Sequence, residues 1–315
     1  LNEAPFMVAE GSALVKVVGT PTKIYALAGY SINTLEMPSF NITTQLWDKF
    51  NGPGRYDYRG IAFILVGNYI YSVQHYTPRR FFRFNITTEQ WEDLGQLPGY
   101  YPYSPQSDQL LWTGGVTYND YIYWLCNYST DNGKLYKYSI SAGTWTYVST
   151  ITSGDCYASD LYYPGTGDFA YVLLGRGLTT FYKVHLGTGA WTALAVTPGA
   201  IQDYHGITYA GGYLYVHQGY YQYGFYRYDI ANNLWTTLTS SPQIMYYASW
   251  YQGADKALIY PGSGYTIYFN TGYYSQAYKY SISGNSWTAN NYPAGDYYSS
   301  QYYPGGGDYI YVSPG

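Results

Sequence analysis

The sequence of 315 residues is rich in aromatic side chains and poor in charge, since 22 % of its residues are Phe, Trp or Tyr and only 11 % are Asp, Glu, Lys or Arg. An apolar content of 47 %, together with 36 glycines and 15 prolines, argues against a disordered chain and favours a packed, turn-rich β protein. The net charge of −4 and the singly scattered Lys and Arg residues supply no basic stripe, so we expect binding neither to nucleic acid nor to an anionic membrane. No apolar run approaches the roughly 18 residues of a transmembrane helix, and no membrane insertion is expected.

One sequence unit recurs six times along the chain. Its copies are residues 40–50, 84–94, 138–148, 184–194, 228–238 and 280–290. Each copy contains one tryptophan at the same place, namely Trp47, Trp91, Trp145, Trp191, Trp235 and Trp287. The tryptophans are 44 to 54 residues apart, which indicates an architecture built from repeats of one structural unit.

Each unit contains four short runs with the composition of β-strands. In the fifth unit they are residues 205–210, 212–218, 224–230 and 234–239, which we name runs A, B, C and D. No segment holds a period of 3.6 residues, so we expect almost no helix. Gly or Asn in the turn between runs C and D suits the left-handed backbone that a hairpin needs.

Four antiparallel strands in each of several repeats predict an all-β fold, a single β-propeller domain over residues 1–315. We favour seven blades, the last one incomplete, because residues 297–315 match the A and B runs at 157–175. The first unit already has its own A and B runs at 12–19 and 23–29, and residues 5–8 would add an outer strand to the last blade. Six blades with an accessory hairpin are the alternative.

The repeat resembles the kelch repeat. The resemblance rests on an aromatic residue followed by Asp, Asn or Ser, a turn and a Trp, as from Tyr228 and Asp229 to Trp235. A proline follows the Trp in several units, at Pro98, Pro198 and Pro242. The paired glycines of the second kelch strand are mostly replaced, for example by Leu174 and Gly175. Kelch-like propellers, with the galactose-oxidase type as distant relatives, act as binding platforms, adhesion modules or copper enzymes, so the resemblance implies the fold and leaves the function open.

The B–C and D–A loops share one face of such a ring and are rich in tyrosine. They comprise residues 99–106, 127–133, 219–224, 242–247, 263–276 and 295–300. Rigid amphipathic rings concentrate in recognition surfaces, so we expect a binding face there. The candidate binding residues are Tyr100, Tyr101, Tyr103, Tyr220, Tyr221, Tyr223, Tyr246, Tyr247, Tyr297 and Tyr298. Alternatively, tyrosine is simply the preferred strand and loop residue of this chain.

Two features favour an extracellular or cell-surface location. Cys126 ends a B run and Cys156 precedes the next A run, so a disulfide between adjacent blades is expected, with two buried thiols as the alternative. Asn41, Asn85 and Asn127 each begin the N-x-[ST] triplet of N-glycosylation, although the first two lie in turns that favour Asn in any case.

Residues with catalytic chemistry are few. His75, His205 and His217 are expected on the loop face and His185 on the other face, and Asp203, His205 and His217 are close enough in the predicted blade for a metal site to be conceivable. Loop histidines that are satisfied by hydrogen bonds are the simpler interpretation, and we expect no cofactor. Asp155, Asp160 and Asp203 lie near D–A loops, but their spacing is not diagnostic of a glycosidase.

The sequence therefore favours a non-enzymatic surface or structural module that recognises other surface proteins or glycans through its tyrosine-rich loop face. A secreted carbohydrate-active or copper-dependent enzyme on the same fold is the alternative hypothesis.

Overall fold

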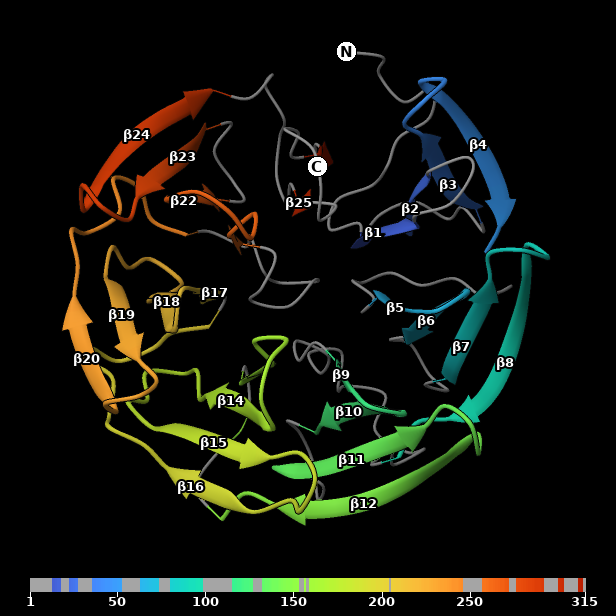
Figure 1. The fold of residues 1–315 in the computed structure, drawn as a ribbon, viewed down its shortest axis with the longest axis horizontal. Coiled ribbons are helices and arrows are strands. Elements are labelled where there is room, and N and C mark those ends of the chain that lie inside the picture. Colours follow the sequence, from blue (N-terminus) through green and yellow to red (C-terminus); the bar gives the residue numbers. More distant parts are fainter. Residues whose placement is uncertain are drawn as a thin grey trace.

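The computed structural model describes residues 13–17, 23–27, 36–52, 63–73, 80–98, 115–126, 132–152, 156, 159–203, 205–245, 257–271, 276–291, 300–302 and 311–313. These residues form an all-β ring of six four-stranded antiparallel sheets, the blades of a β-propeller (Figure 1). Within each blade the strands follow one another in sequence order, with the first strand toward the middle of the ring and the fourth at its outer edge.

The strands of the first three blades are β1 (Ala13–Val17), β2 (Lys23–Leu27), β3 (Glu36–Asn41) and β4 (Leu46–Asn51); β5 (Phe63–Val66), β6 (Tyr69–Val73), β7 (Arg80–Asn85) and β8 (Gln90–Gln96); and β9 (Val116–Tyr118), β10 (Tyr121–Leu125), β11 (Lys134–Ser139) and β12 (Thr144–Thr150). The other blades comprise β13 (Asp160–Tyr162), β14 (Phe169–Leu173), β15 (Phe181–His185) and β16 (Trp191–Ala193); β17 (Gly206–Ala210), β18 (Tyr213–His217), β19 (Phe225–Asp229) and β20 (Leu234–Thr237); and β21 (Leu258–Ile259), β22 (Thr266–Asn270), β23 (Gln276–Ser281) and β24 (Ser286–Asn291). Two further strands, β25 (Ser300–Tyr302) and β26 (Tyr311–Ser313), pair only with each other.

The prediction of seven blades is not supported, and the alternative of six blades with an accessory hairpin fits. The tail supplies only the counterparts of runs A and B, and these two strands form a separate two-stranded sheet, with β25 next to β1 (Figure 1). Nothing in the described part of the chain adds third and fourth strands to this hairpin. Residues 5–8, the predicted outer strand, lie outside the described residues.

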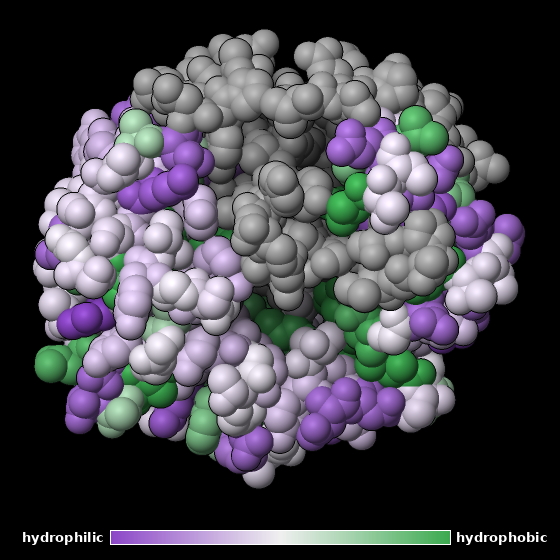
Figure 2. All heavy atoms as spheres, turned by 45° about the horizontal axis from the view of Figure 1, so that its top comes forward, coloured by the Kyte–Doolittle hydropathy of each residue, from purple (hydrophilic) through white to green (hydrophobic). Residues whose placement is uncertain are grey.

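The core lies between the blades. Five clusters of buried side chains each combine two consecutive blades, as where Tyr25 and Met37 of the first blade meet Ile70 and Phe84 of the second. In Figure 2 hydrophobic residues border the hollow in the middle of the molecule and occur at separate places on the rim, where hydrophilic residues are spread. The second strands β6, β10, β14 and β18 are buried on both faces, because each lies between two neighbouring sheets.

The six repeated tryptophans occupy equivalent positions on the outer strands, as predicted. Each is partly buried, and those with cross-blade ring contacts pack on the preceding blade. Trp235 lies 5.2 Å from the ring of Phe181 in the blade before, and its Nε1 donates to the carbonyl of Ala195 in that blade at 2.8 Å. Trp287 repeats the arrangement with Phe225 and with the carbonyl of Thr239.

The turn between the third and fourth strands has one conformation in all six blades. The residue two places before the repeated Trp has a positive φ in each case, and it is Gln45, Glu89, Gly143, Gly189, Asn233 or Asn285. Gly or Asn was expected here and occurs in four blades; Gln45 and Glu89 fill the position in the first two, where a left-handed conformation costs roughly 1 kcal/mol. A side chain at the end of the third strand caps the turn: Asn41, Asn85, Asp229 and His185 each accept backbone hydrogen bonds from the residues two and three places ahead.

One predicted loop is partly a strand. Residues 263–276 were expected to form a loop, but Thr266–Asn270 is the second strand of the sixth blade. The described residues contain no helix, and accordingly none that is long and apolar enough to cross a membrane.

Candidate recognition face

The best-described part of the predicted binding face belongs to the fourth and fifth blades. We call loop 218–224, the B–C loop of the fifth blade, the tyrosine loop. It lies beside segment 198–203, which joins these two blades. Backbone hydrogen bonds fix that segment on both sides, from Gly177 N to Ile201 O at 2.7 Å and from Gln202 N to Gln218 O at 2.8 Å.

Gln218 closes the base of the tyrosine loop. Its Nε2 donates to the carbonyl of Ala200 at 2.8 Å, its Oε1 accepts from the hydroxyl of Tyr226 at 3.1 Å, and its backbone N–H donates to Gly224 O. Gly219 has a φ of +102°, and a Cβ at this position would meet the carbonyl oxygen of Asp203. Only glycine therefore allows this close approach of the two segments.

Three tyrosines are held on this loop. Tyr220 N donates to Asp203 O at 2.8 Å, and Tyr221 N donates to Met245 O at 3.3 Å. Tyr221 has a left-handed backbone with φ +54°, and its side chain is 52 % exposed; Tyr223 is 50 % exposed. Tyr220 is partly buried, and its ring centroid is 4.2 Å from that of Tyr221.

The geometry of the tyrosine loop thus combines two exposed rings with a fixed backbone. Ser241 adds to this rigidity, because its N–H and hydroxyl both lie within hydrogen-bond distance of Tyr223 O, at 2.9 and 3.3 Å. A bulky residue with a positive φ is unusual and persists only where its surroundings enforce it. The other candidate tyrosines, Tyr100, Tyr101, Tyr103, Tyr246, Tyr247, Tyr297 and Tyr298, lie outside the described residues.

Tyrosine also builds the core. The most deeply buried side chains include Tyr71, Tyr123, Tyr138, Tyr215, Tyr228 and Tyr280. Burial raises the pKa of Tyr123 to about 12, and its hydroxyl donates to Leu186 O in the next blade at 2.6 Å. The alternative interpretation of tyrosine as a structural residue therefore holds for these strand positions, while Tyr221 and Tyr223 have exposed rings.

His205 and His217, the two described histidines of the loop face, are buried and neutral. Gly219 N donates to Nδ1 of His217 at 3.1 Å, so Nε2 carries the proton and donates it to Ser241 Oγ at 2.8 Å. This tautomer cannot take a proton from Ser241, which excludes a serine nucleophile activated by His217 in this arrangement. Burial, with a contribution from His205, lowers the pKa of His217 to about 3.

His205 lies just before β17 and is equally buried. Its Nδ1 is 3.2 Å from Gln202 O and therefore carries the proton, and burial lowers the pKa of this histidine to about 4. Within the described residues, no three His, Cys, Asp or Glu side chains come together in a way that could hold a metal ion. Asp203, the third member of the conceivable metal site, accepts a hydrogen bond from Arg176 N through Oδ1 at 3.1 Å.

The remaining polar candidates are dispersed. His75 and Asp155 lie outside the described residues, and Asp160 is buried at the start of β13. His185 caps a C–D turn, on the other face of the ring as predicted.

No disulfide joins Cys126 and Cys156, which corrects the bridge expected from the sequence. Both are buried thiols, and their side chains enter different cores. Cys126 packs between the second and third blades, whereas Cys156 packs between the third and fourth. The backbones are near, since Gly133 N donates to Cys126 O and Asn132 Oδ1 accepts from Cys156 N, but the two side chains pack in different cores.

The sequence analysis missed a repeated cation over an aromatic ring. The Lys and Arg residues that looked scattered include one at the same place in the third strand of five blades. The pairs are Arg83 with Tyr69, Lys137 with Tyr121, Lys183 with Phe169, Arg227 with Tyr213 and Lys279 with Tyr268, at 4.4 to 5.6 Å. The sequence signal was a basic residue two places before the turn-capping residue.

Comparison with known proteins supports the fold only. Neither a protein-family model nor a curated protein matches the sequence. The solved structure of YjhT is similar with a TM-score of 0.59 over 92 % of this chain and 99 % of that chain, at 11 % sequence identity. At this identity the similarity indicates a shared β-propeller architecture.

Proposed function

We propose that this propeller is a non-enzymatic recognition module that binds a protein or a carbohydrate through the tyrosine loop. The observation that carries the proposal is the pair of half-exposed rings, Tyr221 and Tyr223, on a loop whose backbone is fixed by its neighbours. A rigid loop loses little conformational entropy on binding, and Tyr offers both an apolar face and a hydroxyl group.

The proposal includes a kelch-like relationship and a location outside the cytoplasm. The first rests on the turn and Trp pattern, which recurs in all six blades. The second rests on the N-x-[ST] triplets at Asn41, Asn85 and Asn127. We infer that the partners are other surface proteins or glycans, because the chain has no basic stripe and few charges of either sign.

A paired substitution tests the tyrosine loop. The variant Tyr221→Ala with Tyr223→Ala should weaken binding by roughly 30-fold, which corresponds to about 2 kcal/mol for contact residues. Binding can be screened on a glycan array and by capture of surface proteins from the parent cells. Tyr265→Ala is the matched control, since Tyr265 is 71 % exposed but precedes the second strand of its blade, on the face opposite the tyrosine loop.

Two results would contradict the proposal. If the paired variant binds as well as the parent protein, or lowers the melting temperature and leaves binding intact, the tyrosines of this loop serve the fold alone. Stoichiometric copper in the purified protein would favour the enzyme alternative.

A further inference from the structure

The turns of the first two blades carry a chemical group that the other capped turns lack. Asn41 and Asn85 end the third strands of these blades, and each begins an N-x-[ST] triplet that continues to Thr43 or Thr87. The corresponding residues of the later blades are Ser139, His185, Asp229 and Ser281, of which none has a side-chain amide.

Capping does not explain the choice of asparagine. Oδ1 of Asn85 accepts from Thr87 N at 2.9 Å and from Thr88 N at 3.1 Å, and Oδ1 of Asp229 makes the same pair of bonds at 3.0 and 3.1 Å. A carboxylate therefore caps this turn as well as an amide does. The Nδ2 group is what distinguishes the asparagine.

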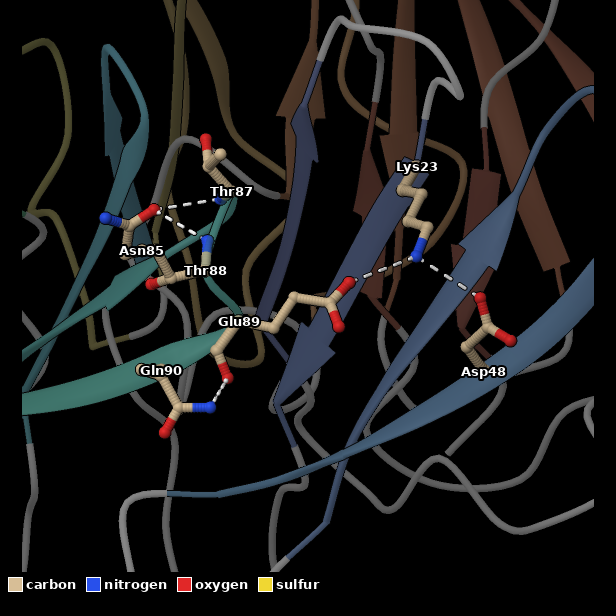
Figure 3. Close-up of polar contacts among 7 residues, drawn as sticks. All are labelled: Lys23, Asp48, Asn85, Thr87, Thr88, Glu89 and Gln90. Atoms are coloured by element: carbon tan, nitrogen blue, oxygen red, sulfur yellow. Dashed lines mark hydrogen bonds and ion pairs between the residues drawn. The ribbon is translucent and has the colours of Figure 1, made fainter.

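The hydrogen bonds of the turn use Oδ1 and not Nδ2 of these partly exposed asparagines. Figure 3 shows Nδ2 of Asn85 directed away from Thr87 and Thr88, while Oδ1 faces their backbone N–H groups. Thr87 and Thr88 are exposed, as are Thr43 and Thr44 in the first blade. In the first blade, Oδ1 of Asn41 accepts from Thr43 N and Thr44 N, both at 3.0 Å, so the two turns present the same geometry.

We propose that Asn41 and Asn85 are N-glycosylated in the folded protein. Nδ2 forms a bond to the anomeric carbon of a sugar carried on a polyprenyl phosphate donor, the bond from that carbon to the phosphate oxygen breaks, and Nδ2 releases one proton. The Oδ1 hydrogen bonds of the turn remain in place, because the reaction uses only the nitrogen. The attached glycan extends into solvent beside the exposed threonines.

The positions of these sites keep the tyrosine loop open. The C–D turns and the B–C loops lie at opposite ends of the strands, so glycans on Asn41 and Asn85 project from the face opposite Tyr221. The two asparagines lie on adjacent blades. Lys23 connects these blades by ion pairs, since its Nζ is 3.2 Å from Asp48 Oδ2 in the first blade and 3.7 Å from Glu89 Oε1 in the second (Figure 3). Both glycans would therefore lie on the same part of the ring, at the first and second blades. The proposal of glycosylation does not depend on the proposed recognition function.

Glycopeptide mass spectrometry of the protein from its parent cells tests the proposal. We expect added sugar mass on the peptides that contain Asn41 and Asn85. Asn85→Asp should remove the mass at that turn and keep the cap, and Thr87→Ala should remove it and keep the asparagine. Thr88→Ala, an exposed neighbour outside the triplet, is the matched control and should retain the modification.

The outcomes separate glycosylation at asparagine from the alternatives. Unmodified peptides at both positions would overturn the proposal, and modification of one alone would overturn it for the other. Sugar mass that persists in Asn85→Asp but disappears in Thr87→Ala or Thr88→Ala would instead identify a hydroxyl-linked sugar. Because Thr87 is exposed, Thr87→Ala gives a result even if Asn85→Asp folds poorly.

Discussion

Replacing Trp235 by Phe should destabilise the protein more than replacing Trp145 by Phe. The two rings have nearly identical aromatic surroundings, with Trp235 at 5.2 and 5.0 Å from Phe181 and Tyr228, and Trp145 at 5.2 Å from both Phe81 and Tyr138. Their indole nitrogens differ, because Nε1 of Trp235 donates to a carbonyl of the preceding blade and Nε1 of Trp145 is buried without a hydrogen-bond partner.

The magnitude follows from this difference. Both substitutions remove the same atoms from similar packing, so that loss cancels in the comparison. Trp235→Phe also loses a hydrogen bond worth roughly 1 kcal/mol, whereas Trp145→Phe removes a buried unsatisfied donor that costs about 1 kcal/mol or more. The free energies of unfolding of the two variants should therefore differ by about 2 kcal/mol.

Thermal unfolding followed by circular dichroism or calorimetry measures the effect. For a chain of this length, about 2 kcal/mol corresponds to a difference of roughly 3 °C in melting temperature. Melting temperatures within about 1 °C of each other would refute the reasoning, because the hydrogen bond from Trp235 would then add nothing to the contact between blades.

Three further substitutions or conditions have predictable effects. His185→Asn should increase the free energy of unfolding by about 0.5 kcal/mol and raise the melting temperature slightly, since Asn is the better turn cap and the same acceptor geometry is available. A lower melting temperature would show that the ring contact between His185 and Phe169, with centroids 5.0 Å apart, contributes more to stability than the cap. His205 and His217 have folded-state pKa values below the unfolded value, so stability is complete above about pH 6.5 and decreases as the pH falls toward 4; the urea midpoint should fall over this range, and less in His205→Gln. Cys126 and Cys156 should resist a thiol reagent in the native protein and both react after unfolding in urea, and a chain with no titratable thiol would contradict their assignment as buried thiols.

The repeat predicted the blades well because each blade needs the same contact with its neighbour. The Trp and the capping residue recur at fixed places since one packs on the preceding blade and the other closes the C–D turn. These requirements are the same in every blade, so they remain visible in the sequence as a repeat. The number of blades was harder to predict, because it depended on whether the C-terminal half unit pairs with two more strands. No pattern in the sequence of the half unit decides this.

The candidate site was less predictable because side-chain direction matters more there than position along the chain. Cys126 and Cys156 lie near each other along the backbone, but one side chain enters each side of the third blade. His217 was placed correctly at a strand end, yet its ring stacks on Phe269 of the next blade at 4.7 Å, a contact that depends on the packing of two sheets. The rigidity of the tyrosine loop likewise depends on Gln218, whose role as a hydrogen-bonding centre has no signature in the sequence.

The construction of each blade from one continuous stretch of chain also has a mechanical consequence. No sheet among the described strands contains both β1 and a strand from the C-terminal part, so the two ends of the ring meet by contact of the hairpin β25–β26 with β1. A force that pulls the two ends of the chain apart is not opposed by hydrogen bonds of a shared sheet where the ends of the ring meet. It can therefore detach whole blades one after another. Each detached blade releases 44 to 54 residues, and at about 3.5 Å per residue the extension should grow in nearly equal steps of roughly 17 nm.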